Sequence, residues 1–181
     1  HRTLEAYADF RDEASAQGVR HFLEVFNPKT QVVTPGADFG SYNNDAIVRC
    51  LAAVSSQDSP LFLKAAYNGP AATEEIASYD PGNLIFGILG GSAGTTRDCL
   101  ELIRQAEKYG ARIALFGRKI YFADDSVIMV KAMRRTIEEG LDSVEATKAY
   151  HADLEKLGIR PLRELSTDLE LTEEVLKAGL E

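Results

Sequence analysis

The residue with the most distinctive chemistry is a lysine near the end of a short apolar segment. Lys64 lies in the run 60–67, whose length and composition are typical of a buried strand. A lysine among apolar neighbours loses its proton more readily than a solvated one, and the neutral amine can attack a carbonyl to form a Schiff base. Such chemistry also needs a neighbour that accepts and returns a proton. The pattern therefore indicates a covalent nucleophile.

Two further residues are placed to exchange protons with Lys64. Glu24 belongs to the preceding apolar run, 21–26, and reaches Lys64 if the two strands are adjacent and parallel. Tyr67 lies at the mouth of the Lys64 strand and is a second candidate acid. Structural alternatives exist for all three: Lys64 can be a surface lysine, Glu24 a partner of Lys64 or Arg20, and Tyr67 a packing residue.

Glycine turns follow the last two apolar runs, 84–89 and 112–116, and suit phosphate binding. The residues concerned are Gly90, Gly91, Ser92, Gly117 and Arg118. Glycine lets backbone amides approach phosphate oxygens, a helix beginning near Thr95 adds its positive end, and arginine supplies a bidentate charge. The alternatives are plain tight turns, and an arginine paired with Asp124 or Asp125.

Apolar runs of strand length alternate with segments of helical periodicity, which predicts βαβ units and a parallel sheet. The predicted strands are 21–26, 60–67, 84–89 and 112–116, and the predicted helices are 4–17, 44–55, 71–79, 95–109, 125–140, 143–157 and a short tail from 172. Thr95 and Asp98 predict a capping box. A doubly wound sheet or half of a (βα)8 barrel accommodates four such strands. We favour the half-barrel, because the dinucleotide-binding glycine motif is absent from the first unit.

Short motifs in the four strands carry a resemblance to a known family. They are Leu23-Glu24, Leu63-Lys64 with Tyr67, Ile88-Leu-Gly-Gly91 and Leu115-Phe-Gly-Arg118. In order and spacing they resemble the last four strands of class I aldolases, notably the fructose-bisphosphate and tagatose-bisphosphate aldolases, over about residues 1–140. The resemblance would make these strands five to eight of a TIM barrel, formed with their helices by 1–141. The helical pattern of 142–181 indicates an extension packed on the last unit, so we expect one domain, 1–181.

The same resemblance implies a metal-independent, cofactor-free lyase that makes or breaks a carbon–carbon bond in a phosphorylated ketose or related carbonyl compound. Lys64 would be the Schiff-base lysine of the sixth strand, and Glu24 would relay protons, as in the Phe-Leu-Glu pattern of the tagatose-bisphosphate enzymes. In the archaeal enzymes a tyrosine near the position of Phe26 transfers protons, which a phenylalanine cannot do. The choice of the general acid and base in this sequence therefore stays open. The sugar phosphate would bind Gly90, Gly91, Gly117 and Arg118.

Two other functions fit these residues. A non-catalytic barrel relative would bind a phosphorylated metabolite or serve as an assembly partner, and a phosphosugar isomerase would use Glu24 as a base without covalent chemistry. Because four strands cannot close a barrel, we expect a homo-oligomer or pairing with a complementary N-terminal half-barrel. The opening residues 1–5 resemble the interior of a longer chain.

Composition bounds the remaining possibilities. The 181 residues are 45% hydrophobic and 27% charged, as in soluble globular proteins, and the net charge of −8 argues against nucleic-acid or anionic-membrane partners. Membrane-span and signal-peptide patterns are absent from the sequence. Cys50 and Cys99 match no metal spacing, and His21 and His151 lack companion ligands. We therefore expect a cytoplasmic protein without a metal.

Overall fold

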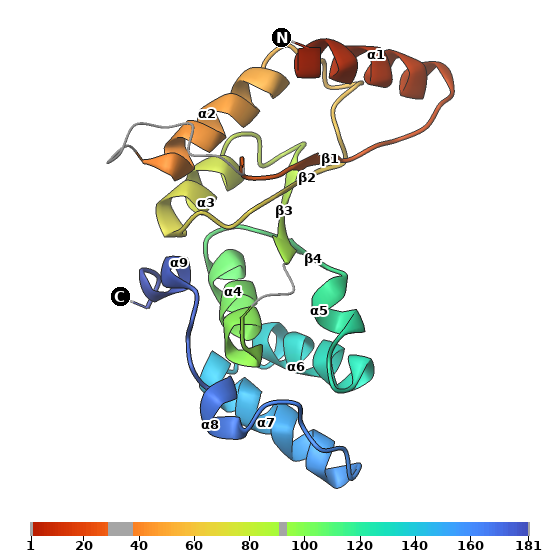
Figure 1. Cartoon of the computed structure of the whole chain (residues 1–181). Coiled ribbons are helices and arrows are strands. Elements are labelled where there is room, and N and C mark those ends of the chain that lie inside the picture. The colour runs from red at the N-terminus through yellow and green to blue at the C-terminus, as the bar shows by residue number, and fades with distance from the viewer. Residues whose placement is uncertain (1, 29–37, 91–93, 181) are drawn as a thin grey trace.

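The computed structural model describes residues 2–28, 38–90 and 94–180 (Figure 1). Within them, four parallel strands form one sheet in the order β1-β2-β3-β4. The strands are β1 (Leu23–Val25), β2 (Phe62–Ala65), β3 (Ile85–Gly90) and β4 (Ile113–Phe116). Each lies within or nearly within a predicted apolar run, and the predicted α/β class is confirmed.

Helices precede, separate and follow the strands. They are α1 (Arg2–Ala16), α2 (Phe39–Leu51), α3 (Pro70–Ala77), α4 (Thr96–Lys108), α5 (Arg118–Tyr121), α6 (Ser126–Glu138), α7 (Ser143–Lys156), α8 (Leu165–Asp168) and α9 (Glu174–Lys177). Helix α2 begins earlier than predicted because the Asp38 carboxylate caps it by accepting the Gly40 amide at 2.9 Å. Helices α5 and α8 were not predicted, since four residues are too few to show periodicity.

The sheet is wound in a single direction. Strand order follows chain order, so right-handed crossovers place α2, α3 and α4 on the same face. Leu63 and Phe86 point toward these helices and are at most 3% exposed within the main core, whereas Ile85, on the other face, is 47% exposed. A doubly wound sheet differs, because its strand order reverses and helices cover both faces.

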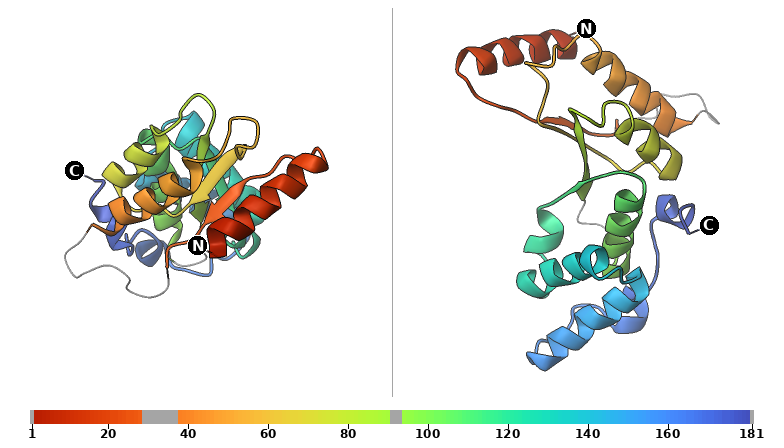
Figure 2. Two further views of the ribbon diagram at one scale, coloured as in Figure 1. Left: turned by 90° about the horizontal axis from the view of Figure 1, so that it is seen from above. Right: turned by 180° about the vertical axis from the view of Figure 1, so that it is seen from behind.

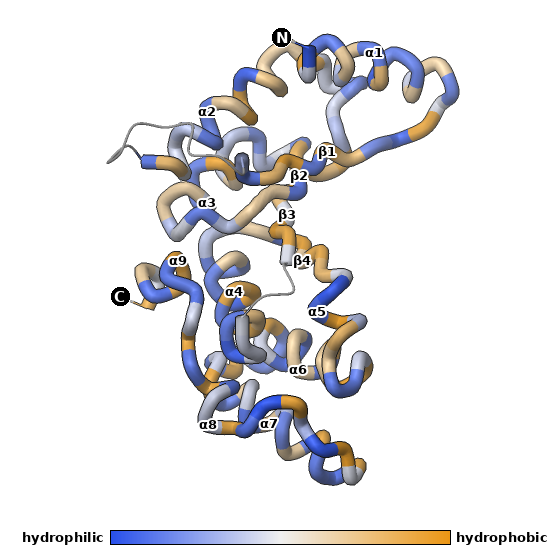
Figure 3. Tube along the Cα trace, viewed as in Figure 1, coloured by the Kyte–Doolittle hydropathy of each residue, from blue (hydrophilic) through white to orange (hydrophobic). Residues whose placement is uncertain are grey.

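The segment after α6 packs mainly on α4. Helix α7 contacts α4 and α6, and α9 contacts α4. Tyr150 and Leu154 of α7 and Leu176 of α9 are buried in the same apolar cluster as Leu63 of β2. Helix α1 lies at the opposite end of the molecule from α7 and α8, and the strands between them are largely apolar (Figures 1, 2 and 3). The predicted extension therefore shares its core with the sheet.

A carboxylate surrounded by cations joins α6 to α7. Asp153 accepts hydrogen bonds from Lys156 and Arg135, both at 2.8 Å, and Lys131 Nζ lies 3.3 Å away. The bond from Lys156 has the largest effect on the pKa of Asp153; together with Lys131 and Arg135 it outweighs burial and lowers that pKa to about 2. Because the folded pKa is depressed, the stabilisation is complete above about pH 4 and is lost as the pH falls toward 2.

We expect Asp153→Asn to lower the free energy of unfolding by about 1 kcal/mol at pH 7, since the mostly exposed lysines are screened by solvent. The difference from the wild type should shrink as the pH falls through 4 toward 2. Urea denaturation at both ends of this range measures it. Glu138→Gln, which breaks the exposed pair with Arg134, is the control and should change little. An equally large loss of unfolding free energy at pH 2 would contradict the lowered pKa of Asp153 in the folded protein.

Candidate functional site

Lys64 and Glu24 meet on the face of the sheet that α2, α3 and α4 leave uncovered. The two residues are register partners on β2 and β1, so their side chains point to the same face. Lys64 Nζ lies 2.7 Å from Glu24 Oε1, and the side chains are 20% and 27% exposed. The structure thus brings together the two residues that the sequence analysis singled out, while their catalytic role stays a prediction.

The surroundings of this pair combine apolar rings with a glycine. Phe22 and Phe62 precede Glu24 and Lys64 on the same face and stack with ring centroids 4.8 Å apart. On the other flank, the register partner of Lys64 on β3 is Gly87, which has no side chain. Lys64 therefore has an acid on one side and an aromatic pair behind it. On its β3 side the side chains of β4 approach Gly87, where an added Cβ would lie 3.1 Å from the Cβ of Ile113.

This geometry supplies an amine nucleophile and a group that can accept its proton. The amine of Lys64 must lose a proton before it attacks a carbonyl, and the Glu24 carboxylate at 2.7 Å is within reach to accept it. The partial exposure of both groups leaves them accessible to a small molecule. The same contact is also an ordinary ion pair, which is the structural alternative to a catalytic role.

Tyr67 does not join this pair. It continues the buried alternation of Leu63 and Ala65, is 7% exposed, and donates its hydroxyl to Gln105 of α4 at 2.7 Å. Burial raises the pKa of Tyr67, and the nearby Tyr109 adds to the shift. The phenol thus lies on the helix side of β2, opposite to Lys64, and the structure favours its role as a packing residue over that of an acid.

An asparagine cluster at the carboxyl ends of β1 and β2 was missed by the sequence analysis. Asn27 and Asn68 exchange hydrogen bonds of 2.7 and 3.2 Å, and Asn43 of α2 donates to Asn27 at 3.4 Å. The available signal was an asparagine shortly after each strand. Because the amides fasten the two strand ends together, they help to hold Glu24 and Lys64 in register.

The predicted phosphate residues that the structure describes lie at the carboxyl ends of β3 and β4, where Gly90 is the register partner of Phe116, the residue before Gly117. Gly91 and Ser92 lie outside the described residues, whereas Gly90 ends β3 and Gly117 precedes α5. A Cβ built on Gly90 would lie 1.2 Å from the Phe116 ring, so close packing accounts for this glycine. A Cβ on Gly117 would meet nothing within 4 Å, so packing does not require the second glycine.

We expect Gly90→Ala to destabilise the fold by about 1–3 kcal/mol, because the added methyl group must displace the ring of Phe116. Thermal or urea unfolding measures the effect. Gly82→Ala is the matched control, since its Cβ would meet nothing within 4 Å. Equal stability of the two variants would show that the contact between Gly90 and Phe116 does not constrain the sheet.

The positive end of α4 holds the protein's own carboxylates, contrary to the expectation that it helps bind phosphate. The predicted capping box is confirmed: Thr95 Oγ1 accepts the Asp98 amide at 3.0 Å, and the Asp98 carboxylate accepts the Thr95 amide at 2.7 Å. Asp168, from α8, accepts the Thr96 amide at 2.7 Å. Both acids are 3% exposed. These internal anions occupy amides on which the prediction relied.

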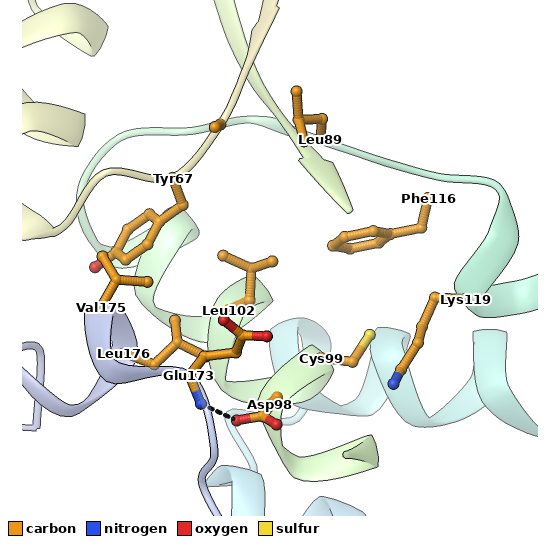
Figure 4. Close-up of a pocket in the computed structure, with 11 residues that line it drawn as sticks. Tyr67, Leu89, Asp98, Cys99, Leu102, Phe116, Lys119, Glu173, Val175 and Leu176 are labelled. Carbon is orange, nitrogen blue, oxygen red and sulfur yellow. Dashed lines mark hydrogen bonds between the residues drawn. The ribbon is translucent and has the colours of Figure 1, made fainter. Parts of the chain in front are cut away.

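Asp98 also ties the C-terminal segment to α4. Its carboxylate accepts the Thr172 hydroxyl at 2.6 Å, the Thr172 amide at 2.8 Å and the Glu173 amide at 3.2 Å. Figure 4 shows the bond from Glu173 beneath an apolar cavity of about 230 Å³ that lies between the strand ends and α9. Tyr67 and Phe116 line this cavity, and Lys64 is not part of its wall.

Lys119 stands at the edge of this cavity (Figure 4) and is 8% exposed. Its Nζ donates to the carbonyl oxygens of Gly94 at 3.0 Å and Thr95 at 2.9 Å. Burial lowers the pKa of Lys119, although the nearby Cys99 opposes the shift. Because the backbone carbonyls engage this amine, Lys119 anchors the turn before α4, and Lys64 is the better candidate nucleophile.

Comparison with known proteins does not assign this chain to a family. The sequence matches no protein-family model and no curated protein. Among the described helices, none is both long enough and apolar enough to cross a membrane.

Proposed function

We propose that the protein containing this chain is a lyase of the class I aldolase type. It makes or breaks a carbon–carbon bond in a phosphorylated ketose or a related carbonyl compound. Lys64 forms the Schiff base and Glu24 relays protons. The observation that carries the proposal is the 2.7 Å contact between Lys64 Nζ and Glu24 Oε1 on the uncovered sheet face.

The chemistry follows from what an amine and a carboxylate can do together. In the cleavage direction, the amine adds to the substrate carbonyl carbon and water leaves, which gives a protonated imine. The electron pair of the breaking carbon–carbon bond moves toward the imine nitrogen, giving an enamine, while Glu24 takes the hydroxyl proton of the departing aldehyde. Return of a proton to the enamine carbon and hydrolysis by water release the second product and the free amine.

We further infer that the sheet is the C-terminal half of a (βα)8 barrel, completed by a second copy or by a complementary half. The single winding direction supports this inference, because barrel strands follow chain order with their helices outside. The uncovered face is partly apolar: Phe22 is 49% exposed and Ile85 is 47% exposed. Within the described residues, β1 and β4 each pair on one side only, so each has a free edge with which a further barrel strand could pair.

Borohydride reduction tests the covalent mechanism. The protein is incubated with dihydroxyacetone phosphate, treated with borohydride and weighed by mass spectrometry, with a sample lacking the ketone as the control. Reduction of the imine leaves a stable secondary amine, so we expect an added mass that requires both reagents. An isomerase that uses Glu24 without a covalent intermediate would gain no mass.

A second candidate is a non-catalytic protein that binds phosphorylated metabolites. The observation that favours it is the placement of Tyr67, whose hydroxyl is donated to Gln105 and leaves Lys64 without that acid. This alternative predicts saturable binding of a phosphate ester that survives Lys64→Met, with no turnover and no trapped imine.

A further inference from the structure

A second cavity lies between the end of β4 and the segment that follows α7. Its volume is about 320 Å³, which falls within the roughly 300–1,000 Å³ typical of small-molecule sites. The wall includes Arg118 and Lys119 from α5, Thr96 from α4, and Arg163 and Asp168 from the C-terminal segment. The cavity therefore joins a predicted phosphate residue to a part of the chain outside the family resemblance.

Within the part of the chain that the structure describes, the arginines of this cavity have no protein partner. Arg118 and Arg163 are both exposed, and neither side chain makes a hydrogen bond or an ion pair within the described residues. The pairing of Arg118 with Asp124 or Asp125, considered from the sequence, is not formed. Burial lowers the pKa of Lys119 and the charge of Arg163 contributes in the same direction, whereas Cys99, Asp168 and Asp98 oppose the shift.

The carboxylates in the same wall are already engaged elsewhere. Asp124 accepts the Tyr150 hydroxyl at 2.8 Å and the Leu162 amide at 2.6 Å. Asp168 accepts the Thr96 amide at 2.7 Å and contacts His151 Nε2 at 2.9 Å. These contacts hold the acids against the protein, so neither one pairs with the arginines. The cavity keeps a local excess of positive groups in a chain whose net charge is −8.

We propose that this cavity binds a phosphate monoester and that Arg163 of the C-terminal segment holds it together with Arg118. Guanidinium groups bind phosphate through paired, charge-assisted hydrogen bonds, which suits two arginines facing one cavity. The proposal deepens the proposed function by adding Arg163 to the phosphate site, and it rests on that function only for the sugar part of the ligand. It makes the C-terminal segment part of a binding site as well as a support for α4.

Inorganic phosphate is the probe that tests this site without requiring catalysis. Binding is followed by isothermal titration and by amide chemical shifts, at constant ionic strength with chloride as the competing anion. We expect saturable binding that Arg118→Gln and Arg163→Gln each weaken about tenfold, since each removes one charge-assisted contact. The double variant should show no saturable binding. Arg160→Gln, an exposed arginine outside the cavity wall, should bind like the wild type.

The outcomes separate this inference from the proposed function. Unchanged phosphate affinity in Arg163→Gln would overturn the inference, as would binding that is weakened equally by Arg160→Gln. Absence of saturable binding to the wild type would overturn it as well. Lys64→Met should bind phosphate normally, so failure of borohydride trapping with intact phosphate binding would reject the covalent mechanism alone. Circular dichroism of each variant confirms that loss of binding is not loss of folding.

Discussion

Replacing Lys64 by methionine is expected to abolish aldol cleavage and the borohydride-dependent mass increase. Methionine retains an unbranched side chain but has no amine, so no imine can form. We expect cleavage by Glu24→Gln to fall about 10²- to 10⁴-fold, the range associated with loss of a general acid or base. Steady-state kinetics with a ketose bisphosphate, together with the mass of the borohydride-treated protein, measure both effects.

An exposed ion pair between a lysine and a glutamate provides the control for the Lys64 and Glu24 variants. Lys148 and Glu145 on α7 form an ion pair at 2.7 Å, with side chains 49% and 55% exposed. Lys148→Met and Glu145→Gln change charge in the same way but should leave cleavage and trapping unaltered. Equal activity of Lys64→Met and Lys148→Met would reject the proposed role of Lys64. A loss seen only together with unfolding would assign Lys64 a structural role.

Replacing Asp98 by alanine is expected to lower the free energy of unfolding by about 3–5 kcal/mol, the largest stability effect that we anticipate. The change removes the α4 capping box and leaves the amides of Thr172 and Glu173 without their acceptor. Hydrogen bonds to charged groups contribute about 1.5–3 kcal/mol each, and their effects are not additive. Urea denaturation measures the change.

The pH dependence of this effect has a definite sign. Burial alone would raise the pKa of Asp98, but hydrogen bonds from Thr172, Thr95 and Glu173 together outweigh burial and lower it. The stabilisation by Asp98 is therefore complete above the pKa of the unfolded chain and is lost as the pH falls through the lower folded value. Asp142→Ala removes the cap of α7, which is exposed, and should cost only about 1 kcal/mol. Equal effects of the two variants would contradict the tertiary role of Asp98.

The local features of this fold could be predicted because they depend on near neighbours in the sequence. Apolar runs located each strand, and the spacing of Thr95 and Asp98 predicted the cap of α4. The proximity of Glu24 and Lys64 followed from adjacent parallel strands, since register partners share a face. These inferences need only the periodicity of apolar residues, the chemistry of helix caps and the right-handed connection of parallel strands.

Features set by distant contacts could not be predicted in the same way. The sequence gives no sign that Thr172 returns to Asp98 or that Asp168 reaches the Thr96 amide, because about seventy residues separate each pair. Gly90 suggested a phosphate turn, whereas the ring of Phe116 explains it through packing across the sheet. Tyr67 was placed by its position near Lys64 in sequence, and only the alternation of β2 together with Gln105 shows its true side.

The site of covalent modification shows directly whether Lys64 forms the Schiff base. Protein reduced with borohydride in the presence of dihydroxyacetone phosphate is digested, and its peptides are sequenced by mass spectrometry. We expect the reduced adduct on Lys64, where the amine contacts Glu24. An adduct on another lysine, or no adduct while the fold and phosphate binding remain intact, would contradict it.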